Sequence, residues 1–432
     1  MKLRNHLRWL VAASACAALA ACGGGSGSQG SNSLDWNPTP DWNSSSSGSS
    51  GTSDNSSPAA TGDNTVPISV DMSMGSINRP YVTVTLCVPG TQSAAQCATV
   101  KNVIVDTGST GLRIAASAIP TLAPLLLTQA GATDDKDGAS PIAECMPFAS
   151  GFTWGSVKRA DIRIGSKTAA NMPIQVMSDG AFATPSDCTS RGGADLGTPA
   201  VIGGNGILGI DNFTSDSLDA ITIALPGLYY YCPSSNGCVS TRMPAAKEVR
   251  NPVTGFATDN NGTVIRLPAV PAGGKTSVTG QLVFGVGTQQ NNMLPASATV
   301  LAVDAYGTFT TQYKGRVLNW SAIDSGTPAF AFADDAIPSA DSMYTPATPL
   351  ALSASMESTD GSGSPVSLSF AIGNATGLLA TNYAAYNNLG MYFSNSSNTM
   401  FLWGLPFFFG RNVYTVIGNA KVGSRTGPFV AF

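Results

Sequence analysis

The feature that most constrains the fold of this chain is a short pattern that occurs twice. An apolar run leads into Asp, a hydroxyl residue, Gly and a second hydroxyl residue, first at 103–109 (VIVDTGS) and again at 322–327 (AIDSGT). In each half an apolar-apolar-Gly element follows later in the chain, at 207–209 and at 402–404. One structural unit used twice predicts two lobes related by a pseudo-twofold axis.

Alternation of apolar and polar side chains dominates the chain after the first 65 residues and predicts strands. The segment 82–88 (VTVTLCV) is one example, and turns rich in Gly, Pro, Asn and Ser separate such segments. Helical stretches are few, with candidates at 115–127 and 214–221. We therefore expect a mostly β, bilobal fold with few short helices, made of an N-terminal β lobe at 66–250 and a C-terminal β lobe at 251–432.

Histidine is almost absent, and this excludes several kinds of active site. The single histidine, His6, lies in an N-terminal segment that we expect to be removed. Ser-His-Asp and Cys-His catalysis, histidine general bases and His-ligated zinc are therefore excluded for the remaining chain. We expect neither a metal nor a cofactor, so the chemistry is left to carboxylates, hydroxyls, amides, thiols, Lys or Arg.

Residues 1–21 have the pattern of a signal peptide. Three basic residues precede an apolar stretch at 9–21 that is too short to span a bilayer. The stretch ends in Leu-Ala-Ala-Cys-Gly, which resembles the lipoprotein box of bacteria. This resemblance implies a lipidated Cys22 as the new N-terminus and, with Gly23 after it, an outer-membrane lipoprotein that faces the periplasm or the cell surface. The alternative is an ordinary signal peptide with an incidental cysteine.

The segment 22–65 consists mainly of Ser, Gly, Asn, Asp and Thr, and it cannot bury enough apolar surface to fold. We interpret it as a flexible tether that holds the folded part away from a membrane. Charged residues make up 11% of the chain and basic runs are absent. Nucleic acid is therefore not expected as a partner.

Six cysteines follow Cys22, and an even number in an exported chain indicates disulfides. The pairs Cys87–Cys97 and Cys232–Cys238 would close short loops, which leaves Cys145–Cys188 as the third pair. A cysteine metal cluster is the rival interpretation, but the chain has no C-x-x-C spacing.

The two Asp-hydroxyl-Gly patterns carry the candidate chemistry. Gly permits a tight turn at a strand end, and the flanking hydroxyls can donate hydrogen bonds that hold Asp106 and Asp324 rigidly. One such turn alone is a weak signal, since Asp-Thr-Gly turns are common on protein surfaces. If two lobes pack about a twofold axis, however, the two carboxylates meet there and share one proton. The ionised carboxylate can then take a proton from water while the protonated one donates to a peptide carbonyl oxygen.

With these motifs the chain resembles the pepsin-like, two-lobed aspartic peptidases, within an uncharacterised bacterial lipoprotein family. The similarity runs from about residue 66 to the C-terminus. Besides the aspartate motifs, it includes in the expected order the elements at 206–209, 281–285, 402–404, 413–416, 421–423 and 429–432.

The resemblance implies that Asp106 and Asp324 are the catalytic pair. Thr107 and Ser325 would interlock the two loops by hydrogen bonds between the lobes. Hydrogen bonds to a charged carboxylate lower its pKa, which predicts an acidic optimum. The remaining supporting residues are Gly108 and Gly326 in the turns, and Ser109 and Thr327, which would each bond the outer oxygen of the nearby aspartate.

Two positions depart from the family pattern. The family's flap hairpin carries a tyrosine over the cleft, whereas the flap-like segment 151–156 (GFTWGS) offers Phe152, nearest to the tyrosine position, or Trp154. Arg113 stands where the family usually has Trp. It could bind an acidic substrate side chain, but we interpret it as a solvated surface charge.

The sequence therefore predicts a monomeric, membrane-tethered aspartic endopeptidase, anchored through Cys22, that binds an extended peptide or protein substrate as an added strand. The alternatives are a catalytically inactive binding or inhibitor protein on the same fold, and a structural envelope lipoprotein in which the aspartates only brace their loops.

Overall fold

The computed structural model describes residues 62–91, 93–190, 193–224, 227–395 and 397–432. The predicted signal peptide, Cys22 and the tether as far as residue 61 lie outside the described residues. At the end of the predicted tether, Asn64 is buried, and its side-chain amide donates to the carbonyl of Phe284 (2.9 Å).

The fold is mostly β, as predicted, and within the described residues the α-helices are three short ones, α1 (Ser186–Thr189), α2 (Pro199–Ile202) and α3 (Ala375–Leu379). The strands of the first half are β1 (Thr65–Val70), β2 (Pro80–Cys87), β3 (Cys97–Asp106), β4 (Thr110–Ala115), β5 (Leu127–Thr128), β6 (Ile142–Phe148), β7 (Gly151–Ile164), β8 (Lys167–Met177), β9 (Ala194–Asp195), β10 (Gly206–Ile210), β11 (Tyr229–Tyr231) and β12 (Val239–Ser240). Those of the second half are β13 (Gly262–Leu267), β14 (Val278–Phe284), β15 (Val300–Ala302), β16 (Phe309–Tyr313), β17 (Arg316–Ile323), β18 (Phe330–Phe332), β19 (Ser339–Ala340), β20 (Met343–Tyr344), β21 (Leu350–Glu357), β22 (Val366–Ile372), β23 (Gly390–Tyr392), β24 (Met400–Trp403), β25 (Arg411–Val416), β26 (Lys421–Val422), β27 (Arg425–Thr426) and β28 (Phe429–Ala431).

The two helices predicted at 115–127 and 214–221 do not form, and those predictions are wrong. The first segment contains two single 3₁₀ turns instead. Its prolines explain the break, because a residue before proline is disfavoured in the helical region. In the second segment Ser215 forms an isolated antiparallel bridge with Arg250 instead.

The strand unit that the sequence repeats has the same topology in both halves. In the first half β10 runs parallel to β3 and antiparallel to β4, with Gly209 opposite Asp106. In the second half β24 runs parallel to β17 and antiparallel to β18, with Trp403 opposite Ile323. Each Asp-hydroxyl-Gly turn thus joins two strands that enclose a third strand. Repetition of this unit is what a pseudo-twofold relation between two lobes requires.

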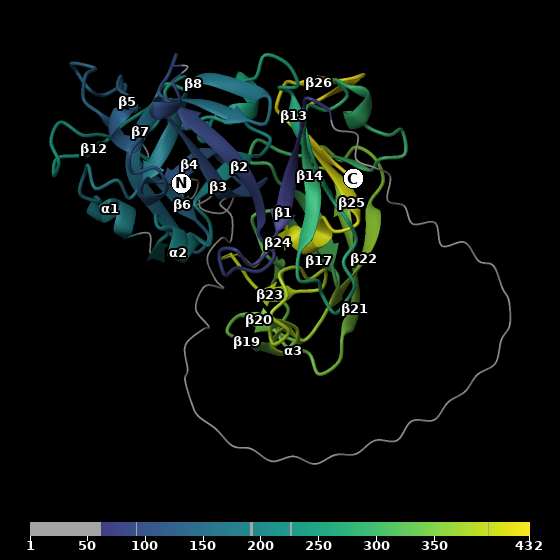
Figure 1. Cartoon of the computed structure of the whole chain (residues 1–432). Helices are drawn as coiled ribbons and strands as arrows, with labels where there is room; N and C mark the ends of the chain where they lie inside the picture. The colour runs from purple at the N-terminus through teal and green to yellow at the C-terminus, as the bar shows by residue number, and fades with distance from the viewer. Residues whose placement is uncertain (1–61, 92, 191–192, 225–226, 396) are drawn as a thin grey trace, which may run out of the picture.

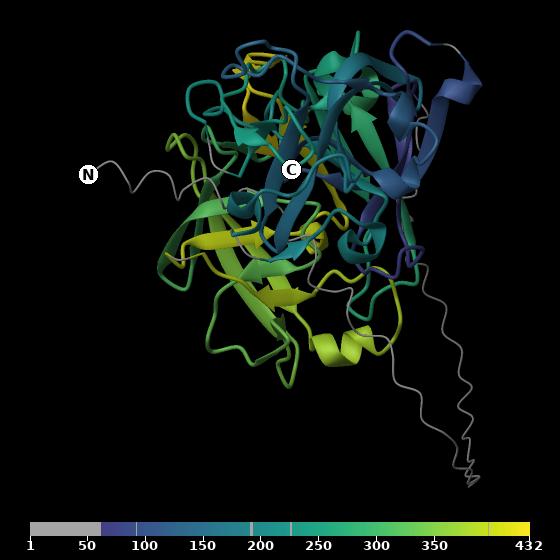
Figure 2. The ribbon, with the colours of Figure 1, turned by 90° about the vertical axis from the view of Figure 1, so that its left-hand side faces the viewer.

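A sheet with strands from both halves of the chain joins the two lobes, and we call it the platform. It consists of β1, β14, β13, β25, β28 and β15, each pairing antiparallel with the next. In Figure 1 most of these strands run close together at the centre right, beside the purple-to-teal first half. Figure 2 shows the first half above and most of the green-to-yellow second half below.

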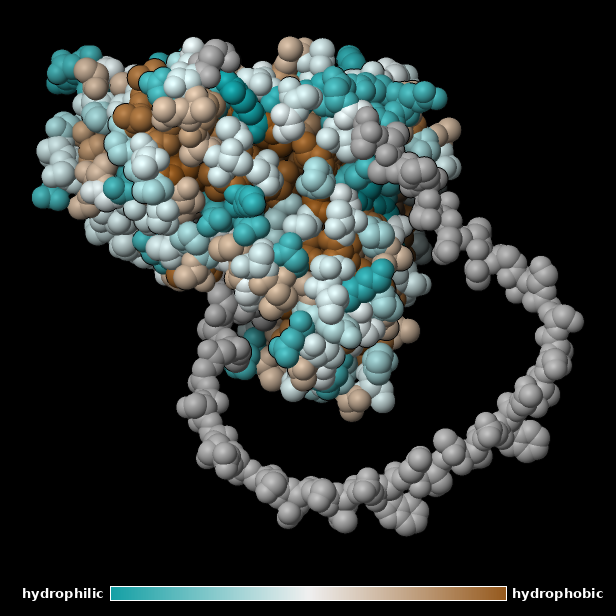
Figure 3. Space-filling view, in the orientation of Figure 1, coloured by the Kyte–Doolittle hydropathy of each residue, from teal (hydrophilic) through white to brown (hydrophobic). Residues whose placement is uncertain are grey.

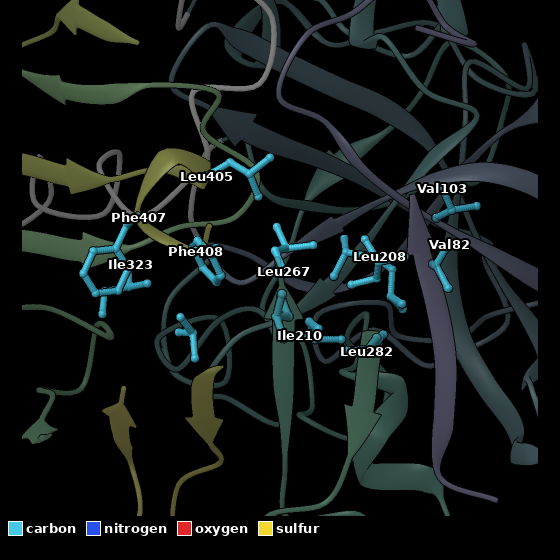
Figure 4. Close-up of a cluster of buried hydrophobic side chains, with 14 of the residues drawn as sticks. Val82, Val103, Leu208, Ile210, Leu267, Leu282, Ile323, Leu405, Phe407 and Phe408 are labelled. Atoms are coloured by element: carbon cyan, nitrogen blue, oxygen red, sulfur yellow. The ribbon is translucent and has the colours of Figure 1, made fainter. Parts of the chain in front are cut away.

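One large apolar cluster extends through both halves and the platform. It includes Val103 and Leu208 beside the first aspartate, Leu282 in the platform, and Ile323 and Phe408 in the second half, and Figure 4 shows these side chains between the strands. Apolar side chains on the outer face shown in Figure 3 gather in its depressions, and polar ones cover most of the rest. No helix in the described ranges has the length and apolar character needed to cross a membrane.

The three predicted disulfides are confirmed. Cys87–Cys97 links β2 to β3, Cys232–Cys238 closes a short loop after β11, and Cys145–Cys188 ties β6 to α1. All three lie in the first half, where they fasten the strands and loops around the β6–β7 hairpin and the β2–β3 hairpin.

Candidate active site

Each aspartate stands at the end of a strand. β3 ends at Asp106, and Asp324 directly follows β17, where its N–H donates to the carbonyl of Trp403 on β24 (3.0 Å). The residues are 0% and 2% exposed, respectively. Because a neighbouring parallel strand fixes the backbone of each, both carboxylates are held in place before any ligand arrives.

The two loops hydrogen-bond their carboxylates in the same way. In both, the N–H of the glycine two residues on donates to Oδ1 (2.9 and 2.8 Å), and the hydroxyl three residues on donates to Oδ2 (2.5 and 2.6 Å). The donors are Gly108 and Ser109 in the first loop and Gly326 and Thr327 in the second. The site therefore has twofold symmetry at the level of single hydrogen bonds.

Thr107 and Ser325 connect the loops across this symmetry. The N–H of Thr107 donates to Ser325 Oγ (3.1 Å), and the N–H of Ser325 donates to Thr107 Oγ1 (3.0 Å). Each hydroxyl donates in turn to a carbonyl of the opposite strand, that of Ile323 (3.0 Å) or Val105 (2.8 Å). Four buried hydrogen bonds thus lock the relative position of the two aspartates.

The glycines of the loops are required by the closeness of the carboxylates. A Cβ atom on Gly108 would lie 2.6 Å from Cγ of Asp324, and one on Gly326 would lie 2.5 Å from Oδ1 of Asp106. Both distances are too short for any side chain. Each loop therefore brings its backbone against the aspartate of the other loop, and the two carboxyl groups are in hydrogen-bond contact.

The titration of Asp324 is displaced as expected for such a pair. Burial raises its pKa well above the usual range, and the negative charge of Asp106 and the hydrogen bond between them raise it further. The hydrogen bonds from Thr327 and Gly326 act in the opposite direction, but burial and like charge win. One proton is thus retained on the pair at pH values where an ordinary aspartate has lost it.

A pocket adjoins the pair and is mostly apolar, with one further acid, Asp211, in its wall. Its lining consists of Thr107, Gly108, Asp211, Asn212, Phe213, Tyr306, Gly307, Thr308, Trp320, Ala322, Ile323, Asp324, Leu402 and Val430.

The two flap candidates, Phe152 and Trp154, lie on β7 in the β6–β7 hairpin and do not line this pocket. They are buried in a small cluster with Tyr230 and the Cys145–Cys188 disulfide. Trp154 Nε1 donates to the carbonyl of Phe182 (2.9 Å). The aromatic residue directly before the hairpin turn is Phe148, which ends β6 and was not among the predicted flap residues; the turn consists of Ala149 and Ser150.

Arg113 is not a solvated surface charge, and that interpretation is wrong. The residue is fully buried on β4, and Nη2 donates to Glu144 Oε1 (2.6 Å) and to Asp216 Oδ2 (2.7 Å). Nη1 donates to the carbonyl of Thr110 (2.6 Å), directly after the first aspartate loop. A buried arginine needs charged partners, and here they come from β6 and from the 214–221 segment.

The buried cluster around Arg113 holds more acids than bases. Burial raises the pKa of Asp216 well above normal, and burial raises that of Glu248 to about 7. Burial alone would lower the pKa of Arg113, but the charges of Glu144 and Asp216 outweigh it and raise it. The Tyr229 hydroxyl also donates to Asp216 Oδ1 (2.6 Å). The sequence did not predict this cluster.

A segment between β1 and β2 also reaches the second loop. Arg79 Nη1 donates to the carbonyl of Gly326, next to Asp324. The side-chain amide of Asn78 donates to the carbonyls of Pro328 (2.7 Å) and Tyr386 (2.8 Å). The first half thus supports the second aspartate loop from a residue that no motif marked.

No group of His, Cys, Asp and Glu side chains in the described part of the chain is arranged to hold a metal ion. The chemistry that this arrangement can perform is proton transfer between two carboxyl groups and a bound reactant.

The chain was compared with known proteins and with family models. The aspartic proteinase from Irpex lacteus has a similar structure with a TM-score of 0.46 and 17% sequence identity, over 85% of this chain and 96% of that chain. A search of curated proteins finds no match. A family model described as "Protein of unknown function (DUF3443)" matches residues 60–432, and the chain therefore belongs to that family.

Proposed function

We propose that this protein is a membrane-tethered aspartic endopeptidase that hydrolyses peptide bonds with Asp106 and Asp324. The observation that carries the proposal is the contact between two buried carboxyl groups at the ends of equivalent strands, one of which has a strongly raised pKa. Such a pair holds one acid and one base side by side, which is what hydrolysis of an amide by water needs.

The roles follow from the protonation of the pair. Asp324 carries the shared proton, since burial and the neighbouring charge raise its pKa, and it donates to the carbonyl oxygen of the scissile bond. Asp106 takes a proton from the attacking water. The donors to its two oxygens, Gly108 and Ser109, stabilise its negative charge. The adjoining pocket, with Tyr306 and Trp320 in its wall, would receive a side chain of the peptide.

The test is hydrolysis of a denatured protein by the purified full chain over a range of pH, with and without pepstatin, an inhibitor of aspartic peptidases. Asp106→Asn and Asp324→Asn keep the size of the side chains, and each is expected to lower the rate by about 10²–10⁴-fold. The matched control is Asp360→Asn on an exposed turn, which leaves the rate unchanged. Equal cleavage by the wild type and Asp106→Asn would reveal a contaminating protease and end the proposal.

The inactive alternative is decided by the same samples. If neither the wild type nor any variant cleaves the substrate, but calorimetry shows that the wild type binds pepstatin, the protein would be a binding protein built on this site. The anchor is a further part of the proposal, and it is supported only by the cysteine motif at Cys22 and the polar segment after it. Fractionation of cells that express Cys22→Ser tests it, because loss of the lipid would move the protein from the membrane to the soluble fraction.

A further inference from the structure

Asp211 is a third buried acid at the site, and the proposed mechanism does not use it. It follows β10 directly, two residues after Gly209, which lies opposite Asp106 in the sheet. It is 9% exposed and lines the same pocket as Gly108 and Asp324. No motif in the sequence marks it.

Asp211 is bound to the first aspartate loop by backbone and side chain. Its N–H donates to the carbonyl of Ser109 (3.2 Å), and its Oδ2 accepts from Thr110 Oγ1 (2.6 Å). Ser109 in turn donates to Asp106 Oδ2 (2.5 Å). The backbone of Asp211 is therefore linked to Asp106 through Ser109, and its carboxyl group holds Thr110, the residue after Ser109. Its second oxygen accepts from the N–H of Phe213 (3.0 Å).

We propose that Asp211 is a positioning residue and the third acid of the site, which fixes the Asp106 loop through Thr110 and, when ionised, keeps the shared proton on the aspartate pair. The working range of the pair would then extend toward neutral pH. This inference builds on the proposed function.

The electrostatics of Asp211 give the sign of the effect. Burial raises its pKa to about 7, the hydrogen bonds from Thr110 and Phe213 lower it, the charge of Asp106 raises it, and the charge of Arg113 lowers it. Because coupling between two acids is reciprocal, an ionised Asp211 disfavours a negative charge on Asp106, and since Asp106 and Asp324 share one proton, it favours retention of that proton by the pair. Below about pH 7 Asp211 is neutral and the effect vanishes.

The experiment compares the pH profile of kcat/KM for the wild type and Asp211→Asn. Asn is neutral at every pH, so the alkaline limb is expected to move to lower pH by about 0.5 unit or more, with the acid limb unchanged. Thr110→Val is a second variant that keeps the acid but removes a donor that lowers its pKa. It should move the limb in the same direction by a smaller amount.

The matched control is Glu248→Gln. Glu248 is buried with a pKa of about 7 but does not line the pocket. The alkaline limb of the kcat/KM profile of Glu248→Gln should therefore coincide with that of the wild type. Profiles of Asp211→Asn and wild type that coincide would overturn the inference and leave the proposed function standing.

If no substrate is cleaved, the proposed function fails, but a second measurement still tests the role of Asp211. The carboxyl carbons of ¹³C-labelled aspartates are titrated by NMR, and Asp324 is assigned from its absence in Asp324→Asn. The titration step of Asp324 is expected at lower pH in Asp211→Asn than in wild type. An unchanged step would refute the role of Asp211 in holding the proton.

Discussion

At the scale of single residues, two opposing effects set the charge of the pair. Burial and the neighbouring carboxylate favour the protonated form of Asp324, while the donors Gly326 and Thr327 favour the ionised form. The first two effects are larger, so the proton stays. The hydrogen bond from the hydroxyl of Thr327 therefore makes the pKa of Asp324 lower than it would be without this donor.

Thr327→Val tests this balance with little change in shape. Loss of the hydroxyl removes a donor to the charged form, so the pKa of Asp324 rises and the alkaline limb of kcat/KM moves to higher pH, by about 1 unit or less. The measurement is the same pH profile as for Asp211→Asn, and the two variants shift the limb in opposite directions. Movement of the limb to lower pH would contradict the assignment of the proton to Asp324.

At the scale of secondary structure elements, the Arg113 cluster ties β4 to β6 and to the segment at 214–221. Nε of Arg113, Oε2 of Glu144 and Oε1 of Glu248 find no hydrogen-bond partner among the described residues. Such a cluster is sensitive to the removal of one charge, because the remaining acids are then buried without a cation. The strand that follows the Asp106 loop thus depends for its stability on charges far from it in sequence.

Arg113→Met should therefore destabilise the protein strongly at neutral pH. The expected loss in the free energy of unfolding is about 3–5 kcal/mol at about pH 7. At about pH 5 the loss should be smaller, because Asp216, whose pKa is raised well above normal, binds a proton there and needs no cation. Urea denaturation at both pH values measures the difference. An equal loss at the two values would show that lost packing, and not charge, is responsible.

The elements also show which features a sequence can predict. The loops at Asp106 and Asp324 were predictable because each is a local pattern. The disulfides were predictable because two pairs close short loops, which leaves one further pair. Arg113 was not, since its partners Glu144 and Asp216 are 31 and 103 residues away and only the fold brings them together. The 115–127 segment was misread because its apolar content outweighed the helix-breaking effect of its two prolines.

At the scale of the whole molecule, the two halves meet at the Thr107 and Ser325 cross-bonds and through the platform. The hydroxyl of Thr107, in the first half, accepts a hydrogen bond from the second half and donates one to it. The hydroxyl of Ser325, in the second half, does the same with the first half. The geometry of the pair is therefore a property of the complete chain. We expect the hydrogen bonds between the two loops to break cooperatively when the lobes move apart, and not one at a time.

A double-mutant cycle with Thr107→Val and Ser325→Ala tests this coupling. Each single change leaves buried backbone groups without a partner and should cost about 1–3 kcal/mol of unfolding free energy. Because the two hydroxyls serve each other's loops, the double variant should lose less than the sum, with a coupling of about 0.5–3 kcal/mol. Chemical denaturation of the four proteins gives the cycle. Additive losses would mean that the two loops are held independently.

The place where the described chain begins has a mechanical consequence. β1 is joined to β14 through six residue pairs, from Thr65 opposite Val283 to Val70 opposite Val278. A pulling force on the N-terminus would therefore act first on the pairing of β1 with β14 in the platform. It would not act directly on either aspartate loop. A force applied to the start of β1 would therefore leave the two carboxyl groups in alignment.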